Sequence, residues 1–343
     1  MTADRVILIA KKEFNDYITS KRYIALLVML LIITGISVCS EFDIYRMQLA
    51  DYSTSGSTTM DEDGNINTGL ADYRPAPINL FSGITGGLAS SVFGALIAIA
   101  MGFDAITKER ESGSIKSLFS HPVYRDEVIN GKAIGGILAL TLAVTTVFMI
   151  TVAILLINSI VPGLDEWPGI FLLWFVSVLF LVSCFAMAIM TSVFARTSGM
   201  SLIYALIIFF AFAYLAPAIA PSVSGYILGP DPMADMRDDI SYEDYELLVE
   251  ETKSYYTSEW EITNIINHLS IKCNYGQIGD AITNPFFLWN RGVGNGYRLD
   301  YAEMGISFED FMGKVGSNIL MMFIFPAVFF GISYVRFMRM DLR

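Results

Sequence analysis

Six long apolar blocks constrain the fold of this 343-residue chain more than any other feature of its sequence. A helix of about 20 apolar residues crosses the roughly 30 Å of hydrocarbon in a bilayer. Because hydrocarbon offers no hydrogen-bond partners, such blocks fold as helices rather than as open strands. We therefore predict an all-α integral membrane protein with six transmembrane helices. The predicted spans are Tyr23–Ser40, Leu80–Phe103, Ala133–Ile160, Gly169–Ala195, Met200–Pro221 and Val315–Val335.

The composition agrees with burial in lipid. Apolar residues make up 54% of the chain and charged residues only 16%, whereas soluble domains are about a quarter charged. The three cysteines, Cys39, Cys184 and Cys273, have no paired spacing. We therefore expect neither a disulfide framework nor a zinc site.

The distribution of charge predicts the orientation of the chain in the membrane. One set of loops carries 14 Lys and Arg against 9 Asp and Glu, while the other carries 8 against 25. Basic loops face the cytoplasm, so we predict a multi-pass protein of the cell membrane with both termini inside. The basic segments are 1–22, 104–132, 196–199 and 336–343, and the acidic ones are 41–79, 161–168 and 222–314.

The longest acidic segment, 222–314, predicts an extracytoplasmic α-rich insertion between spans five and six. Ser241–Leu269 within it has apolar residues at helical spacing. Its many acidic side chains suit the binding of a partner protein outside the cell, which is one alternative for this segment. Just before it, Pro217 and Pro221 predict a break near the outer end of span five.

Residues 1–22 predict an amphipathic helix on the cytoplasmic surface of the membrane. One helical face is apolar, and nearby cations suit the anionic leaflet. An ordinary membrane-proximal anchor has the same composition. The apolar face consists of Val6, Ala10, Phe14, Tyr17 and Ile18, and the cations are Lys11, Lys12, Lys21 and Arg22.

The cytoplasmic loop 104–132 carries the most informative pattern. We expect residues 104–111 to extend span two as a charged helix that Ser112 and Gly113 interrupt. Ser112 can cap a new short helix, and residues 126–132 lead into span three. In this loop a short helix lies between two stiff arms, which can pass a push from a cytoplasmic partner into two spans.

The short helix itself is amphipathic. Ile115, Leu118 and Phe119 fall on one apolar face, and Pro122 ends the helix. An interfacial loop whose apolar residues touch lipid headgroups is the alternative on these features alone.

The same loop resembles the signature of ABC-2 type permeases: Glu-x-Glu-x-Gly-Thr-Leu, a Leu pair, Pro-Val-x-Arg, and Gly-Lys at the next span. Ser114 replaces the usual Thr and keeps its hydroxyl, and Ile115 and Phe119 replace Leu residues. The layout of loops is most similar to the permeases of nitrous-oxide-reductase maturation and of gliding motility. The matching residues are Glu109, Glu111, Gly113, Ser114, Ile115, Leu118, Phe119, Pro122, Val123, Arg125, Gly131 and Lys132.

The resemblance implies a type V ABC exporter-like fold and a subunit that is not itself an enzyme. A separate ABC ATPase would bind ATP and Mg²⁺ and dock on a coupling helix at 112–121, so no cofactor is expected in this chain. The segment 1–22 would be the connecting helix of the family. Further expected partners are a second permease copy or a homologous permease, and membrane lipid, but no nucleic acid.

Other kinds of site find little support. The chain has no Gly-x-x-x-x-Gly-Lys-Ser/Thr motif for ATP phosphates. Residues between Asp61 and Asp72 resemble a calcium loop, yet Ile66 stands where glycine is needed, so a solvated turn is the simpler interpretation. His121 and His268 are expected on opposite sides of the membrane and form no metal pair.

The predicted spans contain essentially no Asp, Glu, Lys or Arg. Ionisable residues in membrane helices usually mark ion or proton pathways, so an ion-coupled carrier and an intramembrane enzyme are both disfavoured. The leading hypothesis is an exporter permease. The alternative is an ATPase-linked scaffold whose outer domain recruits a partner without moving a solute. No residue pattern identifies a substrate.

Overall fold

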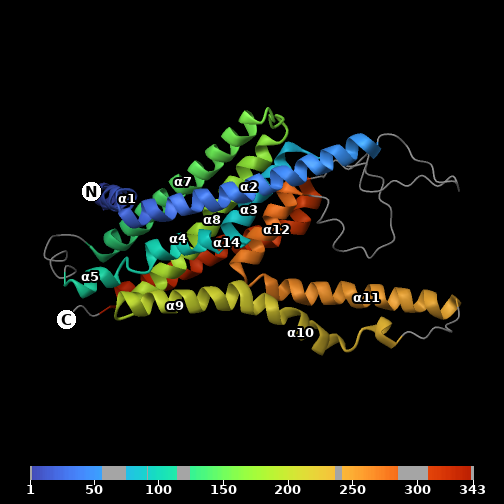
Figure 1. The fold of residues 1–343 in the computed structure, drawn as a ribbon. Coiled ribbons are helices and arrows are strands. Elements are labelled where there is room, and N and C mark those ends of the chain that lie inside the picture. Colours follow the sequence, from blue (N-terminus) through green and yellow to red (C-terminus); the bar gives the residue numbers. More distant parts are fainter. Residues whose placement is uncertain are drawn as a thin grey trace.

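The structure is a computed structural model that describes residues 2–55, 75–90, 92–113, 124–235, 242–284 and 308–340. Within these ranges every regular element is a helix, as predicted. Figure 1 shows the long helices side by side. At one end of the molecule lie α1 (Thr2–Ile18), α5 (Thr107–Glu111) and the end of α14 (Phe308–Met338).

Five helices in the described ranges are long and apolar enough to cross a membrane, and a bent pair would make a sixth. α2 runs well past the predicted end of span one at Ser40. Residues 41–55 hold neither Gly nor Pro, so nothing in the sequence breaks the helix there. The five are α2 (Lys21–Ser55), α7 (Arg125–Ile157), α8 (Trp167–Phe194), the run Ser198–Leu228 and α14.

The predicted second span, Leu80–Phe103, is a broken helix whose two halves bend by 48°. Val92 at the break has a φ of 65°, a left-handed conformation that strains a β-branched residue. A Cβ on Gly94 would lie 2.5 Å from the carbonyl oxygen of Leu88, so only glycine permits this fold. The prediction of six spans holds only if both halves count as one. The elements are η2 (Pro77–Phe81), α3 (Ser82–Thr85), η3 (Gly86–Ser90) and α4 (Phe93–Gly102).

The fifth span continues beyond Pro221, where the sequence predicts its end. α9 (Ser198–Phe210) passes through a π-helical turn, η4 (Ala211–Leu215), into α10 (Ala216–Leu228). Proline removes one backbone donor, and a π-helical turn shifts the hydrogen bonds by one residue. The chain therefore stays helical through both prolines, and the predicted break is wrong.

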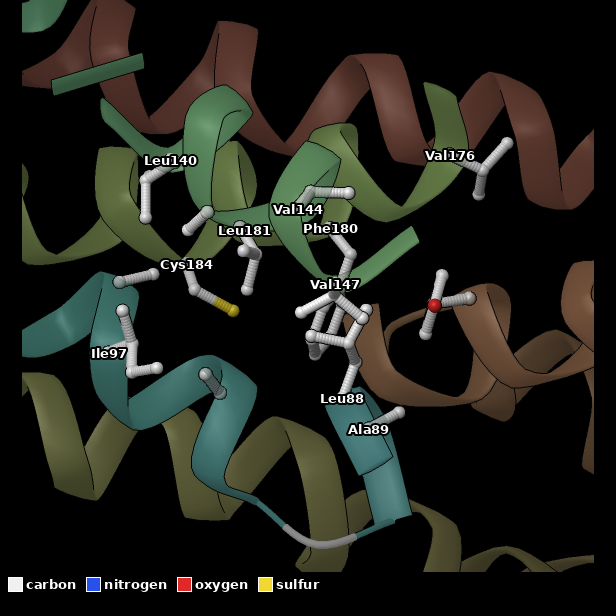
Figure 2. Packing of buried hydrophobic residues seen from close by; sticks show 14 of the residues in the cluster. Leu88, Ala89, Ile97, Leu140, Val144, Val147, Val176, Phe180, Leu181 and Cys184 are labelled. Carbon is white, nitrogen blue, oxygen red and sulfur yellow. The ribbon is translucent and has the colours of Figure 1, made fainter. Parts of the chain in front are cut away.

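The centre of the bundle is α8, whose Phe180, Leu181 and Cys184 are fully buried or nearly so. Side chains from α4, α7 and η3 converge on it in one cluster (Figure 2). A Cβ on Gly136 of α7 would lie 2.1 Å from Cζ of Phe185, so the two helices meet at a glycine. Close packing of this kind transmits displacement from one helix to the next.

The segment predicted as one outer insertion has two parts with different surroundings. α11 (Tyr242–Asn267) lies along α10, as Figure 1 shows. α12 (Ile271–Thr283) instead packs among the spans. Its Tyr275 is fully buried, with its ring centroid 4.7 Å from that of Phe180.

Candidate functional site

The arm that follows α4, residues 103–111, is anchored to the C-terminal part of α8. A Cβ on Gly102 would lie 2.7 Å from Cβ of Ala188, so the chain lies directly on α8 there. Residues 103–106 form a turn, and α5 follows it as the charged end of the second half of the span, Phe93–Glu111. The hydroxyl of Ser192 accepts hydrogen bonds from the backbone amides of Ile106 at 3.0 Å and Thr107 at 3.1 Å. α5 is thus fixed at its first turn.

The other end of α5 is attached to the start of α9. The carboxylate of Glu111 accepts hydrogen bonds from the Ser198 hydroxyl at 2.6 Å and from the Ser198 amide at 3.0 Å. The first amides of a helix lack partners within the helix, and the positive end of the helix dipole favours a carboxylate there. Any displacement of Glu111 therefore bears on the first turn of span five.

Lys132 on α7 joins two further elements. Its ammonium lies 3.0 Å from a carboxylate oxygen of Glu13 on α1 and 2.7 Å from one of Glu109 on α5. The Lys132 side chain is only 7% exposed. A buried cation requires such compensation, because an unpaired charge inside a protein is strongly unfavourable. We call Glu13, Lys132 and Glu109 the charged triad.

Glycines allow α1 to lie directly on α7 beside the triad. A Cβ on Gly131 would lie 2.5 Å from Cγ2 of Ile9, and one on Gly135 would lie 2.9 Å from the carbonyl oxygen of Ala10. The predicted apolar face of α1 therefore packs in part on protein, with Ala10 4% exposed. Ile7 and Leu8 of α1 are exposed.

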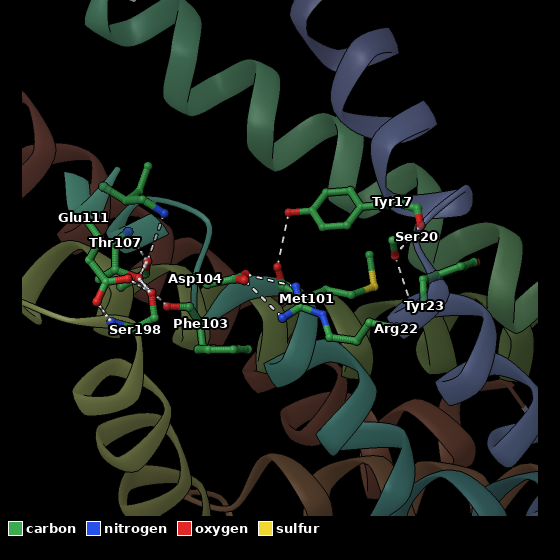
Figure 3. Close-up of polar contacts among 12 residues, drawn as sticks. Tyr17, Ser20, Arg22, Tyr23, Met101, Phe103, Asp104, Thr107, Glu111 and Ser198 are labelled. Carbon is green, nitrogen blue, oxygen red and sulfur yellow. Dashed lines mark hydrogen bonds and ion pairs between the residues drawn. The ribbon is translucent and has the colours of Figure 1, made fainter. Parts of the chain in front are cut away.

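A second set of contacts ties the start of α2 to the α4–α5 turn (Figure 3). The guanidinium of Arg22 donates to both carboxylate oxygens of Asp104, at 3.0 and 3.1 Å. The Tyr17 hydroxyl donates to the carbonyl oxygen of Met101 at 3.2 Å. A bidentate pair between Arg and a carboxylate has a defined geometry, so the turn is held from the α1–α2 side as well.

Two arginines attach the ends of α14 and α8 to the same region. Arg125, at the start of α7, donates to the carbonyl oxygens of Met338 at 3.2 Å and Met340 at 2.6 Å. Arg110 on α5 donates to the carbonyl oxygen of Ala195 at 2.8 Å. The last carbonyls of a helix lack partners within it, and a cation there also complements the helix dipole.

The structure describes half of the predicted coupling residues. Glu109, Glu111, Arg125 and Lys132 all make contacts between elements, as above. Gly113 follows α5 with a φ of 71°, which glycine adopts without strain, and this confirms the predicted interruption. The remaining predicted residues lie outside the described ranges: Ser114, Ile115, Leu118, Phe119 and Pro122.

The sequence pattern misses the partners of these residues. Glu13 and Ser198 complete the site from segments far from the loop in the chain, and Arg22, the partner of Asp104, is equally distant in sequence. An acidic residue at position 13 within a basic segment is the signal that could have indicated a buried lysine partner. Ser198 gives no such signal, because a serine in the first turn of a helix is common.

The described residues contain no cluster of metal-ligating side chains and no disulfide. No group of three His, Cys, Asp or Glu side chains in those ranges could hold a metal ion. The three cysteines are all free. The calcium-like segment between Asp61 and Asp72 lies outside the described ranges.

Comparison with known proteins identifies the family. A family profile described as "ABC-2 family transporter protein" matches residues 7–342, nearly the whole chain. No curated protein matches it, so the predicted likeness to particular subgroups stays a prediction. Five to six apolar spans agree with the profile. This chain therefore belongs to the ABC-2 transporter family and is a membrane permease component of an ABC transporter.

Proposed function

We propose that the chain is the permease subunit of an exporter driven by a separate ATPase that docks on the 104–132 loop. The observation that carries this proposal is the convergence of contacts on the two arms of the loop. Glu111 attaches the first arm to α9, and Lys132 attaches both arms to each other and to α1. Arg125 attaches the second arm to the end of α14.

The physical consequence is a rigid junction between the docking loop and several spans. When bound ATPases close, they would push on residues 112–121 and displace both arms together. Because α5 is bonded to the first turn of α9, the displacement would shift or rotate α9. Because α1 lies on glycines of α7, the same push would move α1 and α7 as one unit. Two permease subunits moving in this way would change access along their shared interface.

Site-specific crosslinking tests the docking site. Cysteines at Ser114 and Leu118, in a chain whose native cysteines are replaced, should crosslink to the cognate ATPase. A cysteine at Tyr226, which is 93% exposed on α10, at the opposite end of the fifth span from Ser198, is the matched control and should not crosslink. The purified chain alone should hydrolyse no ATP. If the complex assembles and is active but neither loop cysteine crosslinks, the coupling assignment is wrong.

The orientation belongs to the same proposal. The basic segments of the chain, including 1–22 and 336–343, would face the cytoplasm of a multi-pass cell-membrane protein. α1, α5 and the end of α14 lie at one end of the molecule (Figure 1), which supports a shared side for both termini and the docking loop. Thiol labelling of cysteines at Thr19 and Tyr226 in intact cells measures this: only Tyr226→Cys should react with an impermeant reagent.

A scaffold that recruits a partner without moving solute is the second candidate. The feature that favours it is α11, where Leu247 is 66% exposed and Trp260 50% exposed among many acidic side chains. Replacing both with Ser separates the hypotheses without disturbing α12. A scaffold would lose partner recruitment, whereas an exporter would keep nucleotide-dependent substrate movement.

A further inference from the structure

We propose that Lys272 and Tyr214 form a binding site for the acidic headgroup of an amphipathic molecule. The site lies within the helix bundle, where α12 meets η4. This proposal deepens the proposed transport function, since it names a chemical class for a molecule that the permease handles. It rests on the position of one cation and one hydroxyl group, and on the apolar side chains near them.

The cation lies at the level of the spans rather than in an outer loop. The Lys272 ammonium is 4.0 Å from the centroid of the Tyr214 ring. Tyr214 lies near the middle of the 31-residue helix Ser198–Leu228. α11 and α12 together form a hairpin whose turn is directed into the bundle, as Figure 1 shows. On the same face, Tyr275 contacts Ser177 in the interior of α8, with 2.8 Å between their hydroxyl oxygens.

The charge of Lys272 is only partly compensated by protein. Among the described residues it makes a cation–π contact with Tyr214 and no ion pair. Asp280 is the only carboxylate on α12 and lies eight residues along the helix, about 12 Å away. A charged side chain at this depth is unfavourable and usually marks a functional site. Within the described ranges, an anion is the complement that this cation lacks.

A hydrogen-bond donor is available beside this cation. The hydroxyl oxygen of Tyr214 is buried and has no hydrogen-bond partner among the described residues. Leaving such a group unpaired costs about 1–3 kcal/mol in general, so native structures rarely keep one without a reason. Tyr214 also belongs to the π-helical turn η4, an element that occurs frequently at functional sites. The ammonium and the hydroxyl can both donate to one anionic group.

The backbone that carries Lys272 is held in place by a polar network. Ser270 caps α12 by accepting from the amide of Cys273 at 3.2 Å. The fully buried Asn274 donates to the carbonyl oxygens of His268 at 2.8 Å and Ser270 at 2.7 Å. Asn318 on α14 donates to the Asn274 side chain at 3.1 Å. A site needs such support to keep its donors in place before the ligand binds.

Apolar surroundings next to the cation determine the rest of the ligand. The chain neighbours of the two site residues, Ala213 and Ile271, line a small apolar cavity of about 30 Å³, which is too small for an acyl chain. Its other walls are apolar and come from α8, α9 and α14. An acidic group attached to an apolar chain matches this combination, because its charge meets Lys272 while its chain stays in apolar surroundings. Free inorganic anions have no apolar chain to place there.

Ligand titration by native mass spectrometry tests the proposal on the purified chain in neutral detergent, without its ATPase. The probes are oleate, dioleoyl phosphatidate, uncharged monoolein and inorganic phosphate. We expect at least one of the two acids to bind about tenfold or more tightly than monoolein. The tighter acid identifies a carboxylate or a phosphate headgroup. Monoolein binding as tightly as both acids, or inorganic phosphate binding as tightly as phosphatidate, overturns the proposal.

Three variants assign the effect to the site. Lys272→Met keeps the apolar stem and should weaken acid binding about tenfold or more, while Lys272→Arg keeps the charge and should retain it. Lys21→Met removes an exposed cation at the start of α2 and should change nothing. If Lys272→Met fails to fold, Tyr214→Phe carries the test and should weaken acid binding about threefold or more. Unchanged acid binding in the folded variants refutes the site. If instead the ATPase does not dock on the 104–132 loop, the proposed function fails but acid binding to the purified chain stays the same.

Discussion

Replacement of Lys132 by Met should release α1 from α7. The substitution removes the cation that lies between Glu13 and Glu109 and leaves both carboxylates in a half-buried space. Each carboxylate contacts the same ammonium, at 3.0 and 2.7 Å, so the two lie within about 6 Å of each other. At an effective dielectric constant of about 20, their repulsion alone is about 3 kcal/mol. Breaking a buried ion pair by removal of one partner typically costs about 3–5 kcal/mol.

Hydrogen exchange of α1 measures this loss. An isolated helix of 17 residues is only marginally stable in water, so α1 amides exchange when the helix undocks. A loss of about 3 kcal/mol predicts exchange on the order of 100-fold faster in Lys132→Met. The double variant Lys132→Met with Glu13→Gln should recover part of the protection, because one of the two repelling charges is gone.

Lys12→Met is the matched control for the triad. Lys12 also approaches Glu13, at 3.6 Å, but its side chain is 68% exposed. Exposed pairs contribute about 0–1 kcal/mol, so α1 exchange should rise by about fivefold or less. Equal exchange in Lys132→Met and Lys12→Met would refute the buried triad, and so would a double variant that exchanges faster than Lys132→Met.

Three further predictions follow from other contacts. Glu111→Ala should speed hydrogen exchange of the Ser198 amide, which donates to Glu111 at 3.0 Å, and Glu166→Ala should leave that amide unchanged. Gly135→Ala should lower the melting temperature through a loss of about 1–3 kcal/mol, since its Cβ would lie 2.7 Å from Cβ of Glu13. Gly276→Ala, with nothing within 4 Å of its Cβ, should be neutral or stabilising by up to about 1 kcal/mol, and equal melting temperatures for the two would contradict the close packing of α1. The hydrogen bond from Tyr256, and then that from the Met233 amide, hold the pKa of Asp231 below its usual value. The stability that ionised Asp231 contributes through these hydrogen bonds is present above the unfolded pKa of about 3.9 and is lost as pH falls through the lower folded pKa. Because Tyr256→Phe removes the larger cause of the lowered pKa, it should move the loss of Met233 amide protection to higher pH.

The spans are predictable from sequence because lipid imposes a simple rule on them. Every crossing must be apolar and helical over about 20 residues, and this rule finds α2, α7, α8, the α9–α10 run and α14. The rule cannot find the break at Val92, because a broken helix inside a bundle is tolerated when neighbouring groups provide hydrogen-bond partners for its backbone. Only the close approach of Gly94 to Leu88 permits that break, and such a contact is invisible in one sequence.

The candidate site is predictable only where its residues are adjacent in the chain. Glu109, Glu111, Gly113 and Lys132 stand in one loop and share a family pattern. Glu13 and Ser198 are far from them in sequence, and their roles depend on how α1 and α9 pack. Lys272 is missed for another reason. It lies in a segment of mixed polarity that a hydropathy criterion assigns to an outer loop, although α12 packs among the spans.

The central claim is that the arms of the 104–132 loop transmit ATPase closure to the spans. Spin labels on cysteines at Thr19 and Arg196, which are both exposed, report the distance between the α1–α2 turn and the start of α9. Pulsed electron paramagnetic resonance on the complex with its cognate ATPase measures that distance with and without ATP and vanadate. We predict a nucleotide-dependent change that Glu111→Ala and Lys132→Met each diminish while the ATPase stays bound. An unchanged distance in the unmodified complex, or the same change in both variants, would contradict the account.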